Sequence, residues 1–292
     1  MKGLVLINAY WRAECVTEQA ERIQRELELA GVETDIKRNG FLPCAAGAGI
    51  ENRIADAYDF CVYLDKDKYV SELLEKSGMR LFNRHEAVRV CDDKMRTYAA
   101  LAANGIAVPY TVPAPLCYTA GSVPRADVLD EVERRLGYPI VIKTSYGSGG
   151  KGVYKAENRA ELERVAGGLL MQPHMYQQYI ESDGKDIRVI VIGGRVTGGM
   201  LRTAPEGEFR SNIAAGGSGQ PYPLDDDAIK LCERVADVFS LDYAGIDLLR
   251  TPHGYIVCEV NSNAFFAEFE RTCGINVAGA YAGHIVRTMS GV

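Results

Sequence analysis

The sequence near the C-terminus contains two apolar segments separated by a short turn, and this pair constrains the fold more than any other stretch. Residues 244–250 and 255–261 are rich in aliphatic and β-branched side chains, and proline and glycine lie between them, which predicts a β-hairpin. Because side chains alternate along a strand, Glu259 and Asn261 share one face of the second segment. Cys258 is expected on the opposite face, with the apolar side chains.

The face on which Asp247 lies depends on the length of the turn. A five-residue loop over residues 251–255 pairs Asp247 with Glu259, whereas a four-residue loop pairs it with Cys258 and directs it away. In the first register, two carboxylates and the amide oxygen of Asn261 converge in an apolar hairpin, where carboxylates are costly unless a cation or donor neutralises them. Such an all-oxygen set suits Mg²⁺, which takes one or two carboxylates together with substrate phosphates. The alternative interpretation is a polar face that is exposed to water.

The composition is that of an ordinary globular protein. The chain has 292 residues, of which 47% are hydrophobic and 25% charged, and this length suits two or three subdomains. A net charge of −6 argues against nucleic acid as a partner, so an anionic substrate requires a local basic patch. We expect no signal peptide and no membrane span, because no apolar run reaches the required length. Eight cysteines without a Cys-x-x-Cys pair indicate a reduced, cytoplasmic protein.

The first 90 residues alternate between strand and helix patterns. Four apolar segments predict strands, at residues 2–8, 32–37, 59–64 and 79–83. A helix is expected from about Thr17, with an inward face of Ala20, Ile23, Leu27 and Ala30. This alternation indicates a small parallel sheet. Trp11 follows the first strand, at the sheet edge where ligands of open α/β sheets bind, so it is either a substrate contact or a packing residue.

A glycine-rich segment, residues 147–152, lies between predicted strands at 138–144 and 153–156. It does not match the phosphate-binding loop of nucleotide hydrolases, because Lys151 is followed by glycine, and the dinucleotide-binding pattern requires a helix where a strand is expected. A glycine-rich loop between two strands covers the phosphates of ATP in protein kinases, and its backbone N–H groups bind anions. Lys143, within the preceding strand, favours a phosphate site over a flexible turn.

Further basic residues occur in other segments, and three of them are arginines near the predicted metal-binding hairpin. Lys94 opens a helix that is predicted to run to about residue 103. Arg188 and Arg202 belong to a predicted hairpin, and Arg210 follows it. Each alone is an ordinary surface residue, but together they supply the local basic field that the acidic chain otherwise lacks. The remaining expected elements are a strand at 175–180, hairpin strands at 186–192 and 195–202, helices at 126–136, 158–167 and 226–240, and a tail helix.

Taken together, these segments resemble the RimK-like branch of the ATP-grasp superfamily. The resemblance runs from about residue 80 to the end and rests on residues 177–180, 186–188, 209–212, 216–217, 244–247 and 259–261. It implies an α/β fold with an α+β C-terminal part. The implied domains are an N-terminal α/β domain that precedes the ATP-grasp fold (1–90), a small ATP-grasp subdomain with a glycine-rich flap (91–175), and a large subdomain with the metal-binding hairpin (176–292).

The resemblance also implies roles for individual residues. Lys94 and Lys143 resemble the two lysines that bind ATP phosphates, and Asp186 resembles the contact to the ribose side. The other implied ATP contacts are the flap residues Gly147, Ser148, Gly149 and Gly150, the adenine hinge Gln177, Gln178, Tyr179 and Ile180, and the segment beside the γ-phosphate, Arg210, Ser211 and Asn212. The implied metal ligands are Asp247, Glu259 and Asn261. Developing charge in the reaction would be stabilised by Arg188, Arg202 and Arg210.

The implied activity is ATP-dependent ligation of a carboxylate to an amine through an acyl phosphate. The implied cofactors are ATP and two Mg²⁺ ions, with Mn²⁺ as a substitute. The implied substrates are small-molecule or peptide carboxylates and amines, or a protein tail. Neither nucleic acid nor a membrane is expected as a partner, and both a monomer and a homo-oligomer are compatible with the sequence. The alternatives are an ATP-grasp kinase, a ligase of a non-amino-acid carboxylate, and a nucleotide-binding module without chemistry. Residues 262–266 depart from the usual x-Ser-Pro-Gly, which leaves glutamate open as a substrate.

Overall fold

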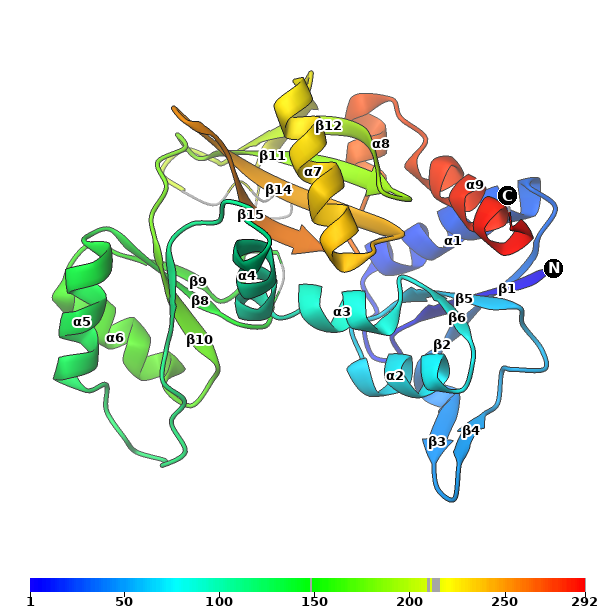
Figure 1. Ribbon diagram of the computed structural model, residues 1–292, viewed down its shortest axis with the longest axis horizontal. Helices are drawn as coiled ribbons and strands as arrows, with labels where there is room; N and C mark the ends of the chain where they lie inside the picture. Colours follow the sequence, from blue (N-terminus) through cyan, green and yellow to red (C-terminus); the bar gives the residue numbers. More distant parts are fainter. Residues whose placement is uncertain (148, 209–210, 212–215, 292) are drawn as a thin grey trace.

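The computed structural model describes residues 1–147, 149–208, 211 and 216–291, and three main sheets organise it (Figure 1). The N-terminal sheet has the strand order β2-β1-β5-β6 and is parallel, as the alternation of strands and helices predicts. Its strands are β1 (Lys2–Ile7), β2 (Glu33–Arg38), β5 (Phe60–Leu64) and β6 (Arg80–Phe82). The other elements of this region are α2 (Lys68–Lys76), α3 (His85–Cys91), η1 (Asn39–Phe41) and a small hairpin of β3 (Cys44–Ala46) and β4 (Ile50–Asn52).

Helix α1 (Glu14–Leu29) covers this sheet and begins before the expected start at Thr17. Its apolar side chains are buried at helical spacing, at Ala20, Ile23 and Leu27. The same spacing predicted a buried Ala30, and this prediction is wrong. The helix ends at Leu29, and Ala30 is exposed at the C-cap.

The second sheet is antiparallel, with the order β7-β10-β8-β9. Its strands are β7 (Thr111–Pro113), β10 (His174–Gln178), β8 (Ile140–Thr144) and β9 (Val153–Ala156). Helices α5 (Ala126–Leu136) and α6 (Arg159–Leu169) pack on its outer face, away from the third sheet (Figure 1). β10 extends across residues 175 and 176, so this strand spans the predicted boundary between the two ATP-grasp subdomains.

The third sheet is antiparallel, with the order β13-β12-β11-β14-β15. Its strands are β11 (Lys185–Ile192), β12 (Arg195–Thr203), β13 (Ser218–Pro221), β14 (Tyr243–Thr251) and β15 (Gly254–Asn261). Helices α4 (Lys94–Ala103) and α7 (Asp226–Phe239) contribute to one core, and α8 (Ala267–Cys273) and α9 (Val277–Ser290) contribute to another. Of the helices in the described ranges, none combines the length and apolar character needed to cross a membrane.

The N-terminal sheet and the third sheet share one hydrophobic core. Ile23 on α1 and Tyr281 on α9 belong to the same buried cluster as Val5 of β1 and Ile190 of β11. Figure 1 shows α1 and α9 side by side, with the two chain termini on the same side of the molecule. Because this core joins both regions, the position of the N-terminal sheet relative to the third sheet is fixed by packing.

The hairpin of β14 and β15 contains a bulge that sets its register. Thr251 pairs with Gly254, so the turn is shorter than either predicted loop, and continuing this register would pair Asp247 with Cys258. The register shifts between Asp247 and Leu248, and Asp247 pairs with Glu259 instead. A bulge places two residues of one strand opposite one residue of the other. The expected pairing of Asp247 and Glu259 is therefore confirmed, but its cause is the bulge and not the loop length.

Candidate active site

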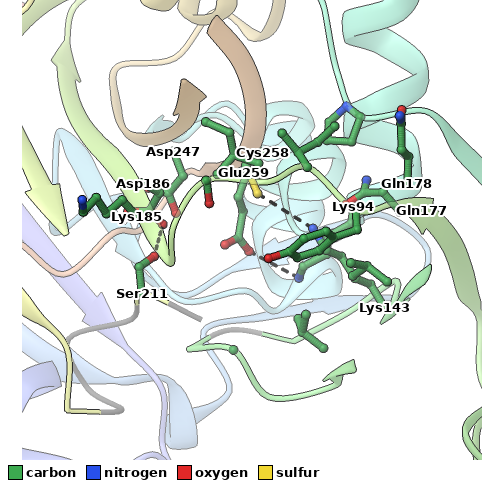
Figure 2. A pocket seen from close by; sticks show the side chains of 18 of the residues that line it. Lys94, Lys143, Gln177, Gln178, Lys185, Asp186, Ser211, Asp247, Cys258 and Glu259 are labelled. Atoms are coloured by element: carbon green, nitrogen blue, oxygen red, sulfur yellow. Dashed lines mark hydrogen bonds and ion pairs between the residues drawn. The ribbon is translucent and has the colours of Figure 1, made fainter. Parts of the chain in front are cut away.

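A cleft between the second and third sheets contains most of the residues singled out in the sequence (Figure 2). Those that line it are Lys94, Lys143, Gly147, Gly150, Gln177, Gln178, Tyr179, Ile180, Asp186, Arg202, Ser211, Asp247 and Glu259. Gly149, Arg188 and Asn261 are not among its lining residues. Ser148, Arg210 and Asn212 lie outside the described residues.

Lys94 connects three elements at the cleft. Asp93 caps α4 by accepting hydrogen bonds from two backbone N–H groups, and Lys94 is the first residue of that helix. The Nζ of Lys94 donates to the carbonyl of Gly147 at 2.7 Å and lies 3.4 Å from Oε1 of Glu259. The side chain thus brings a positive charge between the glycine-rich loop and β15.

Lys143 lies on β8 and is buried with Tyr98 of α4. Its Nζ donates to the hydroxyl of Tyr98 at 3.2 Å and lies 3.9 Å from Sγ of Cys258. Burial opposes the positive charge, but the interactions with Cys258, Tyr98 and Glu259 outweigh it and raise the pKa of Lys143. Lys143 is therefore a cation at neutral pH, in a position where water screens it little.

Cys258 faces the cleft next to Glu259, and the expectation from alternation, which placed it on the opposite face, is wrong (Figure 2). The bulge is the reason, because it turns two consecutive side chains toward the same side. Tyr98 was also missed in the sequence, although its hydroxyl donates to the carbonyl of Cys258 at 2.6 Å. Its signal was the spacing from Lys94, because residues four apart share a helix face.

The acidic end of the cleft is a buried cluster of alternating charges. Asp247 accepts from Nη2 of Arg188 at 2.9 Å and lies 2.8 Å from Nη2 of Arg202. Arg202 also donates twice to Asp186, at 2.6 Å each, and Ser211 donates to the same carboxylate at 2.5 Å. The two arginines thus offset both carboxylates, a condition that buried charges require.

The two carboxylates differ in their pKa. Burial would raise the pKa of Asp247, but Arg188 and Arg202 outweigh it and lower that pKa below 3.8. Burial raises the pKa of Asp186, and the charge of Asp247 raises it further, against the opposing effect of Arg202. Asp247 is therefore the carboxylate with the stronger tendency to remain charged.

The apolar end of the cleft has the character of a site for a planar ring. Pro109, Val141 and Leu249 line it together with Tyr179 and Ile180. The preceding strand, β10, pairs with β8 on one side and is held by residues 110 and 111 on the other. Gln177 donates its side-chain amide to Thr111 at 2.8 Å, and the backbone of Gln178 donates to Tyr110 at 2.9 Å.

The glycine-rich loop requires glycine for steric reasons. Gly147, Gly149, Gly150 and Gly152 all have a positive φ, which other residues adopt at a cost. A Cβ on Gly152 would lie 2.2 Å from Oγ1 of Thr144, so a larger residue does not fit there. The loop therefore approaches the end of β8 closely, and Lys151 and Gly150 line the cleft from its side.

The proposed metal ligands have the chemistry of a site for a hard cation. Asp247 and Glu259 are cross-strand neighbours, and Asn261 follows on the same strand, opposite Gly245. All three side chains offer oxygen, the donor that Mg²⁺ takes. In the described part of the chain there is no group of three or more His, Cys, Asp or Glu residues that could hold a metal, so a metal here depends on the amide of Asn261 or on phosphate oxygens.

Comparisons with known proteins agree with this geometry. A family model described as the RimK-like ATP-grasp domain matches residues 91–285. A β-citrylglutamate synthase B from Danio rerio is 37% identical over 229 residues, which are 77% of this chain and 55% of that protein. A probable α-L-glutamate ligase 2 from Hahella chejuensis is 34% identical over 216 residues, which are 73% of this chain and 68% of that protein.

The fold has relatives among solved structures as well. A RimK domain ATP-grasp protein from Sphaerobacter thermophilus superimposes with a TM-score of 0.72 at 18% identity, over 97% of this chain and 99% of that chain. At this identity the likeness shows the fold alone. The chain spans about half the length of the first of the curated relatives that it matches. The family model covers more than half of the chain, and the chain therefore belongs to the RimK-like ATP-grasp family.

Proposed function

We propose that this chain is an ATP-dependent ligase that joins a carboxylate to an amine through an acyl phosphate. The observation that carries the proposal is the cleft in which Lys94 and Lys143 face Asp247 and Glu259, with an apolar wall at one end. Two lysines and two carboxylates around one cavity suit a polyphosphate with its metal. The names of the matched relatives, a synthase and a ligase of glutamate compounds, support the same reaction class.

ATP would lie along the cleft with its base against the apolar wall of Pro109, Val141 and Leu249. Its phosphates would reach Lys94 and Lys143, which supply the positive charge that phosphoryl transfer requires. The hydrogen bond of Lys94 to Gly147 ties this charge to the glycine-rich loop. Backbone N–H groups of glycine-rich loops bind phosphate oxygens in other nucleotide sites, and we assign this loop the same task.

Mg²⁺ would be held by Asp247, Glu259 and Asn261. When bound, it would neutralise charge on the phosphate oxygens and orient them. Oδ2 of Asp247 already faces Nη2 of both arginines, whereas Oδ1 accepts from Nε of Arg188 and has a second lone pair that could bind the metal.

The chain's own contribution to the chemistry is positioning and electrostatics. A carboxylate oxygen of the first substrate would attack the γ-phosphorus, and ADP would leave. The amine of the second substrate would then attack the acyl carbon, inorganic phosphate would leave, and the amine would lose a proton. Arg188 and Arg202 are pre-positioned by Asp247 and Asp186, so they can stabilise the developing negative charge without reorganisation.

The substrates proposed are an amino acid or peptide that provides the carboxylate and a second one that provides the amine. The eight cysteines are all free, which supports a reducing compartment, and we place the reaction in the cytoplasm.

The test is ADP release by the purified protein with ATP and Mg²⁺ across pairs of amino acids, short peptides and dicarboxylates, with mass spectrometry of the products. We expect release that requires a carboxylate and an amine together, and a product mass that corresponds to an amide. Glu259→Gln should reduce kcat at least 100-fold, while the control Glu268→Gln on α8, outside the cleft, should keep full activity. Release without an amine, with a stable phosphorylated product, would make the chain a kinase and contradict the proposal.

A further inference from the structure

Two exposed aromatic rings from distant parts of the sequence meet outside the ATP cleft. Trp11 lies in the loop after β1, and Phe265 lies between β15 and α8. Their ring centroids are 5.4 Å apart, and the ring planes are inclined by 78°. Trp11 is 39% exposed and Phe265 37%, whereas the next residue, Phe266, is fully buried. Phe266 thus belongs to the core, and the contact of Phe265 with Trp11 is not needed to build it.

The loop that carries Trp11 is held firmly. The side-chain oxygen of Asn8 accepts from the backbone N–H of Tyr10 at 2.8 Å and of Trp11 at 2.9 Å. Arg38 donates to the carbonyls of Asn8 at 2.8 Å and Trp11 at 3.0 Å. The amide of Asn8 donates in turn to Asp65 at 3.1 Å. Because the backbone of this loop is already fixed, a ligand that binds the exposed ring does not have to order the loop, and the entropic cost of binding is lower.

This polar network joins the carboxyl ends of three parallel strands. Asn8 follows β1, Asn39 follows β2 and Asp65 follows β5. Asn39 donates to Asp65 at 2.7 Å and accepts from the backbone of Ala9 at 2.8 Å. None of these residues lines the ATP cleft, so the ATP site does not explain the network. Its structural effect is to fix the position of the Trp11 loop.

Phe265 is connected to the acidic end of the active site. Its neighbour Ala264 packs against Gly245, where an added Cβ would lie 2.6 Å from the Cβ of Ala264 and 3.1 Å from Cδ of Arg188. Arg188 binds Asp247, and Ala264 therefore shares a packing site with the arginine that we place beside the reacting groups. Figure 1 shows the end of β15 directed toward α1 and the parallel sheet. Phe265 thus lies shortly after the end of β15, the strand that carries Glu259 and Asn261.

We propose that Trp11 and Phe265 bind the apolar side chain of the amino-acid or peptide substrate. The inference rests on the proposed function and names the substrate class for it. An edge-to-face pair offers apolar ring surface on both members, and it favours an aromatic or branched aliphatic side chain. A glutamate side chain would place a carboxylate against these rings and lose hydration, while the guanidinium of Arg38 beside the loop is already engaged with the carbonyls of Asn8 and Trp11 and the hydroxyl of Thr17. The pair therefore selects an apolar side chain over an acidic one.

Trp11 is the only tryptophan in the sequence, so its fluorescence reports directly on this surface. The full chain, with Mg²⁺ and a non-hydrolysable ATP analogue, is titrated with phenylalanine, leucine, their dipeptides, glutamate and the glutamate dipeptide. We expect a saturable change in emission with at least one apolar ligand, at a concentration at least tenfold below that for either glutamate ligand. Phe265→Ala should weaken this binding at least tenfold. The matched control is Tyr10→Ala, because Tyr10 is 92% exposed in the same loop, and it should bind like the wild type.

Three results would overturn the proposal: equal or tighter binding of glutamate, unchanged binding by Phe265→Ala, or no change in emission with any ligand of the panel. Phe265→Leu keeps an apolar side chain and should retain most of the affinity, which separates recognition from loss of the fold. The ADP-release assay is run on the same ligands. Binding of apolar ligands without amide formation would contradict the ligase and support the ring pair, whereas ligation of glutamate without a change in emission would support the ligase and contradict the ring pair.

Discussion

The two walls of the proposed ATP cleft are built in different ways. On the third sheet, Asp186 and Asp247 are held by arginines from neighbouring strands, through several side-chain hydrogen bonds within 3 Å. On the opposite wall, Lys94 binds a backbone carbonyl of a loop in which glycines with positive φ are concentrated. The first wall fixes charges in place before a ligand arrives, as electrostatic catalysis requires. The second wall depends on the backbone of its glycine-rich loop, where side chains larger than glycine are strained by the positive φ.

The largest expected effect comes from breaking the first wall. Arg202→Met leaves Asp186 without its bidentate partner and Asp247 with one arginine fewer, in a buried site. Removing one partner of a buried ion pair costs about 3–5 kcal/mol, and we expect this loss in the free energy of unfolding, measured in urea. Arg195→Met is the control on the same strand, because its ion pair with Glu233 is exposed and its loss should cost less than about 1 kcal/mol. Equal stability of the two variants would show that the wall is not held by these charges.

A smaller effect is expected at the second wall. Gly152→Ala places a Cβ 2.2 Å from Oγ1 of Thr144 at a φ of +75°, so the end of the loop must move. We expect a loss of about 1–3 kcal/mol from backbone strain and a rise of about tenfold in the KM for ATP. Gly149→Ala is the matched control, because its φ is also positive but a Cβ there meets nothing within 4 Å. If both variants raise the KM equally, the strain alone matters and the contact with Thr144 does not.

Tyr98→Phe tests the junction between the walls. The variant loses the hydrogen bond to the carbonyl of Cys258 and the contact with Lys143, while its ring stays in place. We expect a loss of about 1–2 kcal/mol in stability, because a buried carbonyl loses its donor. The KM for ATP should rise more than kcat falls, since Lys143 loses a fixed position but keeps its charge. An unchanged KM with reduced stability would restrict Tyr98 to a structural role.

The smallest effect concerns pH and the second sheet. Burial lowers the pKa of His174 below its usual 6.5. The unfolded chain therefore binds a proton as the pH falls below about 6.5 while the folded chain does not, so stability falls over that window until the folded pKa is reached. We expect the wild type to lose up to about 1 kcal/mol between pH 7.5 and 5.5 that His174→Gln does not lose, measured by urea unfolding at each pH. A parallel decline in both proteins would assign the effect to other groups.

Much of the fold was predictable because periodicity is a local property. The strands of the parallel sheet and the hairpin of β11 and β12 lie close to where apolar patterns predict them. The burial of Ala30 was predicted incorrectly, because helical spacing does not show at which residue a helix ends. Helix α1 ends one residue earlier, at Leu29, and Ala30 is its C-cap. The short strand β7 was not among the predicted elements, and it forms because β10 offers an edge to pair with.

The candidate site was predictable in composition but not in geometry. Lys143, Asp247 and Glu259 were singled out from their types and spacing, whereas Asp186 and Ser211 were named only from the family resemblance. The bulge at Cys258 was not, because nothing in the sequence distinguishes an extra residue in a strand from a regular one. The pairing of Asp247 with Arg188 and Arg202 depends on the order of β12, β11 and β14 in the sheet. This order cannot be read from local sequence patterns.

The packing of α1 against α9 has a consequence for synthesis. Helix α1 leaves the ribosome well before α9. Its apolar face includes Ile23 and Leu27, and the partner surface around Tyr281 and Ile285 is made later. Until α9 has been made, the apolar face of α1 is only partly covered. Exposed apolar surface of this kind is prone to aggregation. The core that contains α1 can therefore form completely only after α9 has been synthesised.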